Sequence, residues 1–294
     1  MRKKKPKITL LDVIVGLVVL AVGVYFAYRV SVGLKYKWHW DVIPQYLFRY
    51  DEEKNRWGMN LLMQGLMTTI WLSIWGILLA TIIGTVMGIF RISDSLFKRL
   101  IGWTYVELMR NIPPLVLIFI FYYFVSGQIM PVLGVDDFIR SRSESTQAVL
   151  SFFSVPPQLF TAFLSGVITI ALFQSAYVTE IIRAGIQSIE KGQWEASYAL
   201  GLSWWQQMRH IILPQAVQRI LPPLAGEFIN TIKYSSIVSV ISIQELTFQG
   251  MELMAASLLT FEVWLTITGL YLVLTLLLSL GVARLETHMR RSLA

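Results

Sequence analysis

Long apolar runs alternate with short polar segments along the chain. Four runs carry no charged residue, and they cover residues 61–90, 111–135, 145–179 and 263–283. Each is long enough for the roughly 20 residues that a helix needs to cross a bilayer. Their apolar residues do not alternate with polar ones over about ten residues, as they would in the strands of a membrane barrel. The pattern therefore predicts an all-α polytopic membrane protein.

A further apolar stretch covers residues 8–28 and follows the basic sequence MRKKKPK. A basic start, an apolar run and the small residues Ala21 and Gly23 are also typical of a signal peptide. The apolar run continues to Tyr28, however, which favours an uncleaved first crossing. We therefore expect an N-terminal unit of residues 1–58, composed of one transmembrane helix and an extracytoplasmic segment.

Six crossings are expected in all: 8–28, 62–90, 104–126, 159–182, 212–242 and 262–284. An even number places both termini on the same side, and the basic N-terminus places them in the cytoplasm. The inner side, counted as the N-terminal tail, 91–111, 183–219 and the residues after 283, holds 5, 4, 4 and 3 Lys and Arg residues, which is 16 of the 25. The outer stretches 29–60 and 127–160 hold 6 and 2, and Lys233 lies within a crossing. The excess of basic residues inside agrees with the rule for membrane proteins.

Composition agrees with this interpretation. The chain is 55% apolar and 15% charged, which is outside the range of ordinary soluble domains. Its net charge of +7 is explained by basic inner loops, so it does not indicate nucleic-acid binding. Since the chain has no cysteine, disulfides and cysteine-based metal sites are excluded.

Two outer segments connect the crossings. Residues 36–57 combine Trp and Tyr with charges, a pattern that fits either an interfacial aromatic belt or a docking surface for a partner. Residues 127–158 are expected to form a loop with one short helix. Within 62–90, Gly84 and Gly88 form a GxxxG pattern that favours close helix packing, and Gly76 lies two turns earlier. Proline pairs at 113–114 and 222–223 are expected to begin or kink their helices.

The inner segment 192–216, GQWEASYALGLSWWQQMRHIILPQA, is polar between two apolar runs. Apolar residues at helical spacing predict two short helices, with Gly201 ending the first in a left-handed cap. Ser203 and Gln206 predict a capping box at the start of the second helix. We expect Glu195 in the first turn of the first helix, where the helix dipole favours a carboxylate, and Pro214 at the end of the second.

This inner segment carries no basic residue from 193 to 208. A helix that lies on a membrane surface usually has Lys or Arg on its polar face. A compact and weakly charged helix is better suited to insertion into the groove of another protein.

The sequence Glu195-Ala196-Ser197, with Gly201 and then Pro214 downstream, resembles the EAA loop of bacterial ABC importer permeases. The blocks GLMTTIWLSI, YVELMRNIPPL, AYVTEIIRAGIQSIEKGQ, LPQAVQRILPP and IKYSSIVSVI resemble the polar amino-acid permease family. The resemblance covers residues 64–284. It implies a five-helix type I importer permease core within 59–294, with a coupling loop at about 190–214 and one additional N-terminal helix.

In this family the loop forms a coupling helix that docks on a separate ATPase. The residues implied in coupling are Gln193, Glu195, Ala196, Ser197, Leu200 and Gly201. The chain lacks the GxxxxGK[ST] phosphate-binding loop, so ATP and Mg²⁺ are expected to bind to the partner and no cofactor to bind here. The other implied partners are a second permease chain, identical or paralogous, an extracytoplasmic amino-acid-binding protein and membrane lipid in the bacterial inner membrane.

Ionisable side chains inside crossings are costly and point to function. The residues expected along the substrate pathway are Glu180, Glu227, Lys233, Ser235 and Ser236. For Glu180, an ion pair with Arg183 one turn away is an equal alternative. Lys233 has three possible partners, namely Glu227, Glu180 and the carboxylate of a bound amino acid.

Three departures from the family pattern concern this region and the loop. Tyr234 stands where relatives usually carry Asp or Asn, Gly226-Glu227 replaces a pattern that usually contains Asn, and Ser197 replaces alanine. The polarity of the pathway is therefore expected to differ from that of typical members.

Two other functions were weighed. A secondary transporter or channel acting alone would show inverted internal repeats and would leave the inner segment without a role. An intramembrane enzyme would need a cluster of reactive side chains, whereas His39, His210 and His288 lie at loops and edges without ligand spacing. The chain is therefore expected to perform no catalysis of its own.

Overall fold

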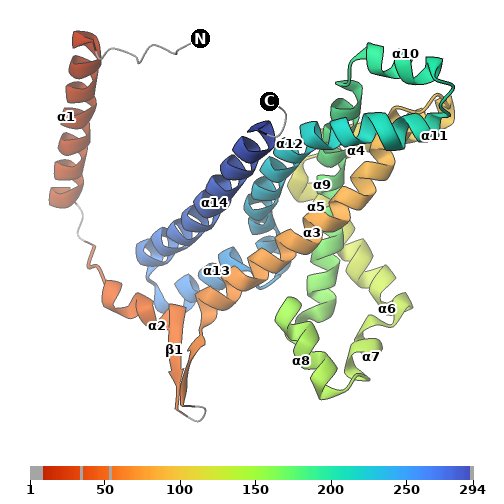
Figure 1. Ribbon diagram of the computed structural model, residues 1–294. Coiled ribbons are helices and arrows are strands. Elements are labelled where there is room, and N and C mark those ends of the chain that lie inside the picture. Colours follow the sequence, from red (N-terminus) through yellow and green to blue (C-terminus); the bar gives the residue numbers. More distant parts are fainter. Residues whose placement is uncertain (1–8, 34–35, 53–54, 292–294) are drawn as a thin grey trace. The chain divides into compact units, whose positions relative to one another are not determined.

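The computed structural model describes residues 9–33, 36–52 and 55–291 (Figure 1). Contacts divide the chain after Trp40 into two units. The first unit contains α1 (Leu10–Gly33), which Asp12 caps by accepting hydrogen bonds from the backbone N–H and the hydroxyl of Thr9 at 2.7 and 2.8 Å. Leu10–Arg29 is apolar and long enough to cross a membrane, so the predicted additional helix is present. The predicted boundary after residue 58 stays a prediction.

The second unit begins with short elements that the sequence did not predict. They are a 3-10 turn (Trp40–Val42), α2 (Ile43–Leu47), β1 (Phe48–Asp51) and β2 (Arg56–Met59). The two strands form an antiparallel hairpin in which Phe48 lies opposite Met59. The Asn60 amide holds the hairpin to α2 by donating to the carbonyl oxygen of Gln45 at 2.6 Å.

The long helices α3 (Leu61–Arg91) and α9 (Phe160–Gln187) form the most extensive contact of the unit. Glycines of α3 permit this contact. A Cβ atom at Gly84 would lie 2.7 Å from Val178, and one at Gly88 would lie 2.8 Å from Ile182. Since no side chain larger than hydrogen fits there without movement, the predicted close packing through the GxxxG pattern is confirmed.

The predicted crossing at 104–126 is wrong in its bounds. The structure divides it into α4 (Leu96–Asn111) and α5 (Pro114–Phe124), with Ile112 extended at φ −96° and ψ 138°. A residue that precedes proline is sterically driven out of the α-helical region, and Ile112 precedes Pro113. The crossing that meets the length and hydropathy criteria is instead Pro114–Leu133.

The outer segment is helical for most of its length, so the prediction of a loop with one short helix was wrong. A π-helical turn (Val125–Ile129) continues α5 and leads to further short elements. These are α6 (Met130–Leu133), α7 (Val135–Arg140), α8 (Glu144–Phe153) and a 3-10 turn (Pro157–Leu159).

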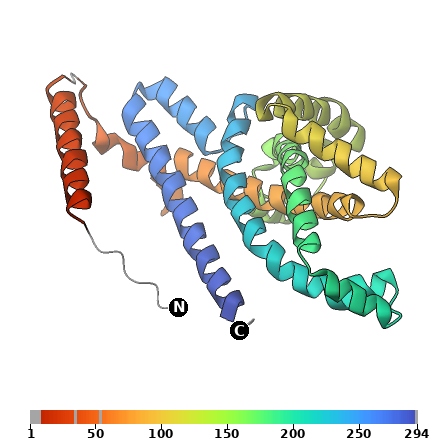
Figure 2. The same ribbon diagram turned by 90° about the horizontal axis from the view of Figure 1, so that it is seen from above.

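After α9 the chain forms the inner segment and then returns through the bundle. The elements are α10 (Lys191–Ala199), α11 (Trp204–Gln207), a π-helical segment (Met208–Ile212), α12 (Leu213–Ser235), a 3-10 segment (Ser236–Ile241), α13 (Leu246–Ser257) and α14 (Thr260–Arg291). In both views α12 lies between α9 and α14 (Figures 1 and 2). The short helix α13 was not predicted.

Five helices of the described residues could cross a membrane by length and composition: Leu10–Arg29, Leu61–Arg91, Pro114–Leu133, Pro157–Gln187 and Thr260–Arg284. The predicted crossing 212–242 is not among them, and its α-helix ends at Ser235. Polar residues such as Gln218, Arg219 and Lys233 lower its hydropathy. Pro222 and Pro223 lie inside α12 and remove two backbone donors from it.

A buried carboxylate joins three helices away from the inner segment. Glu245 is fully buried at the start of α13, where it accepts hydrogen bonds from Thr69 of α3 at 3.3 Å, Tyr271 of α14 at 2.8 Å and the backbone N–H of Phe248 at 2.8 Å. Burial raises the pKa of Glu245, and these hydrogen bonds oppose that rise. The carboxylate thus fixes α13 against α3 and α14.

We expect Gly84→Ala to destabilise the protein by about 1–3 kcal/mol, because the added methyl group would overpack the contact between α3 and α9. Gly269→Ala in α14 is the matched control, since its Cβ would meet no atom within 4 Å. The temperature at which each purified variant loses its folded state in detergent measures the effect. Equal midpoints for the two variants would contradict the role of the glycine contact.

Candidate coupling segment and translocation site

The inner segment is a helix, a glycine elbow and a second helix, as predicted. Gly201 adopts φ +73°, and its N–H donates to the carbonyl oxygen of Tyr198 at 2.9 Å. Ser203 begins α11 with a capping box, in which its N–H donates to Gln206 Oε1 at 2.9 Å and its Oγ accepts from the Gln206 N–H at 3.4 Å. Backbone conformation and side-chain caps therefore fix the elbow independently of any partner.

Two details of the prediction were wrong. Since α10 begins at Lys191, Glu195 lies beyond its first turn, and that turn contains no acidic residue. Pro214 does not end the second helix, because α11 continues through the π-helical segment into α12, with the proline near the start of α12. A proline lacks the N–H that would reach back four residues and its ring crowds that carbonyl group, and a widened turn accommodates both effects.

The inner segment has a buried side and an exposed side. Ser197 is buried, and its hydroxyl donates to the carbonyl oxygen of Trp194 at 2.8 Å. On the exposed side, Tyr198 is 77% exposed, Leu200 is 76% exposed and Trp205 is 62% exposed. Of the other residues implied in coupling, Gln193, Glu195, Ala196 and Gly201 are also exposed. Large apolar side chains that protrude from a polar segment are typical of a protein-binding surface.

The buried side of this segment belongs to the core of the bundle. One apolar cluster contains Ile186 of α9, Met208 and Ile212 after α11, and Ile220 of α12, and Trp194 packs against it. Figure 1 shows α10 and α11 at the end of the bundle where α14 also ends, opposite the hairpin and α8. Packed side chains therefore connect the exposed surface of α10 to α9 and α12.

Glu180 lies in an ion-pair cluster near the inner segment. Its Oε2 accepts from Arg183 Nη2 at 2.7 Å, and its Oε1 lies 3.1 Å from Arg91 Nη2 of α3. The structure thus forms the ion pair that the sequence left open as the alternative, and it adds a second arginine. This cluster ties the end of α3 to α9.

Glu227 occupies a polar site between α9 and α12. Its Oε1 accepts a hydrogen bond from Gln174 Nε2 at 2.9 Å, and the same amide donates to the hydroxyl of Thr231 at 2.9 Å. All three side chains are buried, and Gln174 Oε1 has no partner among the described residues. The carboxyl group of Glu227 thus has neutral donors, and no ion pair joins it to a cationic side chain among the described residues.

Aromatic side chains and an arginine adjoin this polar site. Phe173 of α9 packs edge-to-face against Tyr177 and Tyr234, with ring centroids 5.4 and 5.5 Å apart. The guanidinium carbon of Arg110 lies 5.5 Å from the centroid of the Tyr177 ring. Tyr177 follows Gln174 by three residues on α9, so the contact of Arg110 adjoins the hydrogen-bonded site of Glu227.

Gln174, Tyr177 and Arg110 were not among the predicted site residues. The predicted crossing 104–126 included Arg110, whereas α4 ends at Asn111. Arg110 lies three residues before Pro113, and the irregular backbone expected at this proline pair, beside a cavity, was the available signal.

The structure does not bring the remaining predicted pathway residues to Glu227. Lys233 is exposed and forms no ion pair with another described residue. The hydroxyls of Ser235 and Ser236 donate to the backbone oxygens of Ile232 and Lys233, at 2.8 and 2.6 Å. Both hydroxyls thus donate to backbone oxygens one turn earlier in the chain and not to Glu227.

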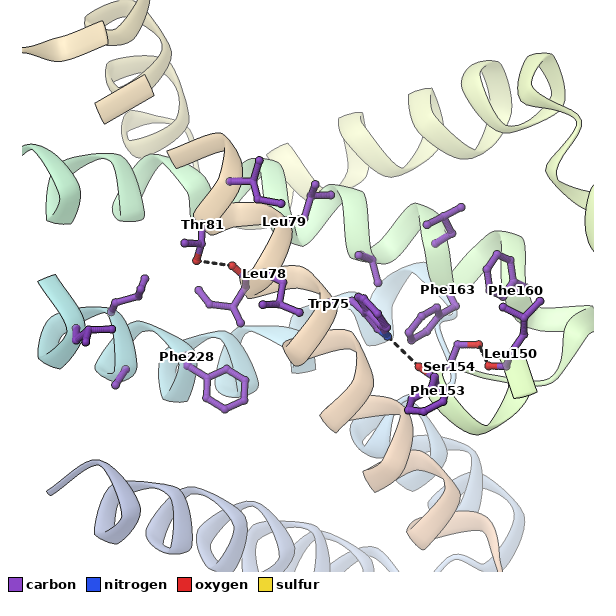
Figure 3. A pocket seen from close by; sticks show the side chains of 17 residues that line it. Trp75, Leu78, Leu79, Thr81, Leu150, Phe153, Ser154, Phe160, Phe163 and Phe228 are labelled. Atoms are coloured by element: carbon purple, nitrogen blue, oxygen red, sulfur yellow. Dashed lines mark hydrogen bonds between the residues drawn. The ribbon is translucent and has the colours of Figure 1, made fainter. Parts of the chain in front are cut away.

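A cavity of about 920 Å³ opens beside α3, α8, α9 and α12 (Figure 3). Its walls are almost entirely apolar and include Trp75, Leu78, Phe153, Phe163 and Phe228. Trp75 Nε1 donates to the carbonyl oxygen of Phe153 at 2.9 Å, which connects α3 to α8 at the rim. Such walls suit apolar side chains or lipid rather than a zwitterion.

Comparisons with known proteins agree with these features. Residues 76–291 match the family described as "Binding-protein-dependent transport system inner membrane component". The chain is 34% identical to the probable glutamine ABC transporter permease protein GlnM of Bacillus subtilis (strain 168), over 80% of this chain and 96% of that protein. It is 33% identical to the glutamine transport system permease protein GlnP of Escherichia coli (strain K12), over 79% and 94%.

Solved structures show the same fold. The crystal structure of an amino acid ABC transporter with histidines aligns with a TM-score of 0.62 and 32% identity, over 78% of this chain and 94% of that chain. The MetNI methionine ABC transporter in an inward facing conformation aligns with a TM-score of 0.57 and 16% identity, which supports the fold alone. With at least four membrane-crossing helices besides α1, the chain is a multi-pass membrane protein, and it belongs to the family of binding-protein-dependent transport system inner membrane components, the permeases of ABC importers.

Proposed function

We propose that this chain is the transmembrane permease subunit of an ATP-driven importer of polar amino acids. The observation that carries this proposal is the capped inner segment, whose apolar side chains protrude from one side while its other side packs into the core. A partner that binds Tyr198 and Leu200 would move Trp194, and with it the ends of α9 and α12. Separate ATPase subunits would bind ATP and Mg²⁺ and supply this movement, because a ligand that favours one of two conformations shifts the population toward it.

The rigid elbow suits this role. Gly201 and the capping box fix the angle between α10 and α11, so a force on α10 is passed on instead of being absorbed by a flexible loop. The π-helical segment then continues without a break into α12, which carries Glu227. In this proposal, closure of the ATPases turns α12 and α9 relative to α3. The polar site then opens in turn to one side of the membrane and to the other.

The polar site suits an amino acid. A zwitterion needs a negative and a positive partner, and we assign these roles to Glu227, which Gln174 of α9 holds, and to Arg110, which lies over Tyr177 of the same helix. Gln174 and Tyr234 add hydrogen-bonding groups and an aromatic wall. We also assign Lys233, Ser235 and Ser236 to the pathway. They lie at the end of α12 and the start of the following 3-10 segment, and they do not contact Glu227. Glu180 contributes through the arginines at the inner end of the pathway.

Orientation and assembly follow from the same features. We infer a cytoplasmic inner segment and cytoplasmic termini, since 16 of the 25 Lys and Arg residues fall on that side.

The apolar cavity beside α3 and α12 fits the side chains of a second permease chain, because an open apolar surface of this kind is usually covered in an assembly. An extracytoplasmic binding protein would deliver the amino acid to the opposite end, where the hairpin and α6–α8 lie.

Leu200→Ala tests the coupling surface. We expect it to weaken binding of the ATPase subunits by about tenfold, because truncating an anchor side chain in an interface typically costs more than 1 kcal/mol. Transport by the reconstituted complex should fall in parallel, while insertion of the permease into the membrane is unchanged. Leu133→Ala is the matched control, since Leu133 is similarly exposed at the opposite end. Equal ATPase binding by both variants would refute the assignment of the surface.

Glu227→Gln tests the pathway. The substituted amide keeps an oxygen that can accept from Gln174 but loses the charge that would pair with the ammonium group of a substrate. We expect the KM for uptake to rise about tenfold or more, with ATP hydrolysis in the absence of substrate retained. Glu252→Gln, an exposed carboxylate of α13, serves as the control. An unchanged KM would place the substrate elsewhere.

A further inference from the structure

A basic pocket lies where α3 and α9 end, beside the start of α4. It has a volume of about 270 Å³, and its lining residues are Arg91, Arg99, Leu100, Trp103, Arg183 and Gln187. Three guanidinium groups and no carboxylate contribute to this lining. The pocket shares Gln187 with a neighbouring cavity that Lys191 and Trp194 of α10 also line, so it lies on the same side of the bundle as the inner segment.

Close packing of α4 on α3 builds the pocket. A Cβ atom at Gly102 would lie 3.1 Å from Arg91 Cγ and 3.1 Å from the carbonyl oxygen of Met87. The side-chain stem of Arg91 therefore lies directly against α4. Arg99 and Trp103, on the turn that surrounds Gly102, reach the same cavity from α4.

The cationic charge of the pocket exceeds the anionic charge beside it. Glu180 Oε2 accepts hydrogen bonds from both Nε and Nη2 of Arg183, at 3.0 and 2.7 Å, and its Oε1 lies 3.1 Å from Arg91 Nη2. One carboxylate thus serves two arginines, and Arg99 adds a third charge. Arg91 Nη1 is buried and has no hydrogen-bond partner among the described residues. Glu180 Oε1 beside it is also buried and without a hydrogen-bond partner among the described residues, so the two arginines are paired with one carboxylate through incomplete hydrogen bonding.

The surroundings indicate the kind of anion. Leu96, Phe97, Leu100 and Trp103 on the first turns of α4 are all about half exposed or more. Two of them, Leu100 and Trp103, line the pocket together with the arginines. An inorganic anion would use only the guanidinium groups, whereas a phospholipid would place its phosphate on the arginines and its acyl chain along the apolar side chains of α4.

We propose that this pocket binds a phosphate group, and that an anionic phospholipid of the cytoplasmic leaflet supplies it. Guanidinium groups bind phosphate oxygens through paired N–H donors, and Arg91, Arg99 and Arg183 line one cavity beside a single carboxylate, that of Glu180. The assignment to the cytoplasmic leaflet rests on the orientation given under the proposed function. A bound phosphate would stabilise the packing of α3, α4 and α9 next to the inner segment.

Arg99→Gln tests the site, because Arg99 is exposed and its loss leaves the Glu180 ion pairs in place. The permease is purified with its ATPase subunits from nanodiscs of equal phosphatidylglycerol and phosphatidylcholine, and the retained lipids are counted by native mass spectrometry. We expect the ratio of retained phosphatidylglycerol to phosphatidylcholine to fall by about fivefold more for Arg99→Gln than for Lys98→Gln, because only Arg99 would bind the phosphate directly through paired N–H donors. Lys98→Gln is the matched control, since it removes the same charge one residue away and does not line the pocket.

Two comparisons decide whether the site binds a lipid, binds a free phosphate ion or is not specific. One is with the control variant, and the other is a titration with inorganic phosphate. Equal ratios for Arg99→Gln and Lys98→Gln would overturn the proposal, because the lipid preference would then be a property of the whole basic surface. In detergent without phospholipid, inorganic phosphate is added and the thermal midpoint is recorded. Stabilisation by phosphate that Arg99→Gln abolishes, with no lipid preference in nanodiscs, would overturn the lipid source and assign the site to a free anion. Lipid retention needs no transport, so its outcome is independent of whether the importer function holds.

Discussion

The close approach of α3 and α9 is the constraint on which the rest of the second unit depends. Between apolar helices in lipid there is little hydrophobic driving force, so van der Waals contact and hydrogen bonds must hold them together. Gly84 and Gly88 bring α3 against Val178 and Ile182 with no room for a Cβ atom, and Gly76 does the same at Ile170. Once these two helices are fixed, α12 can pack against both of them, and α4 can close on the end of α3 through Gly102.

Two polar clusters lie at different positions along α9, and they differ in the charge of their members. At the inner end, Glu180 joins Arg91 and Arg183, which is a compact cluster of opposite charges. Further along, the carboxyl group of Glu227 accepts hydrogen bonds from the neutral amides of Gln174 and Asn230. The first carboxylate is paired with arginines, whereas the second has only neutral donors among the described residues. This difference is the reason why the proposed function assigns the substrate to Glu227 and not to Glu180.

The inner segment and the polar site are connected by apolar packing. Met208 and Ile212 lie in one cluster with Ile186 and Ile220, so the buried side of the segment continues into α9 and α12. The positive φ of Gly201 and the capping box of Ser203 fix the backbone between α10 and α11, and the apolar cluster anchors the same segment on α9 and α12. Close-packed interiors transmit displacement, which is the basis of the coupling role proposed for this segment.

The sequence by itself determined the helical membrane class, the additional N-terminal helix, the elbow at Gly201 and the capping box, because each depends on local chemistry or on hydrophobic periodicity. It failed where local signals were weak or competed with tertiary contacts. The helical outer segment, the continuation through Pro214 and the short α13 were all missed or misplaced. The proline pair at 113–114 was correctly expected to begin or kink a helix, but the crossing 104–126 was placed across it. Among the site residues, sequence alone identified Glu227 as a costly buried charge, but it could not pair it with Gln174, which lies 53 residues away on α9. The folded arrangement alone placed Gln174 against Glu227 and Arg110 against Tyr177, and it set Lys233 apart. A side chain's neighbours across helices depend on helix rotation and packing, which the order of residues along one helix does not fix.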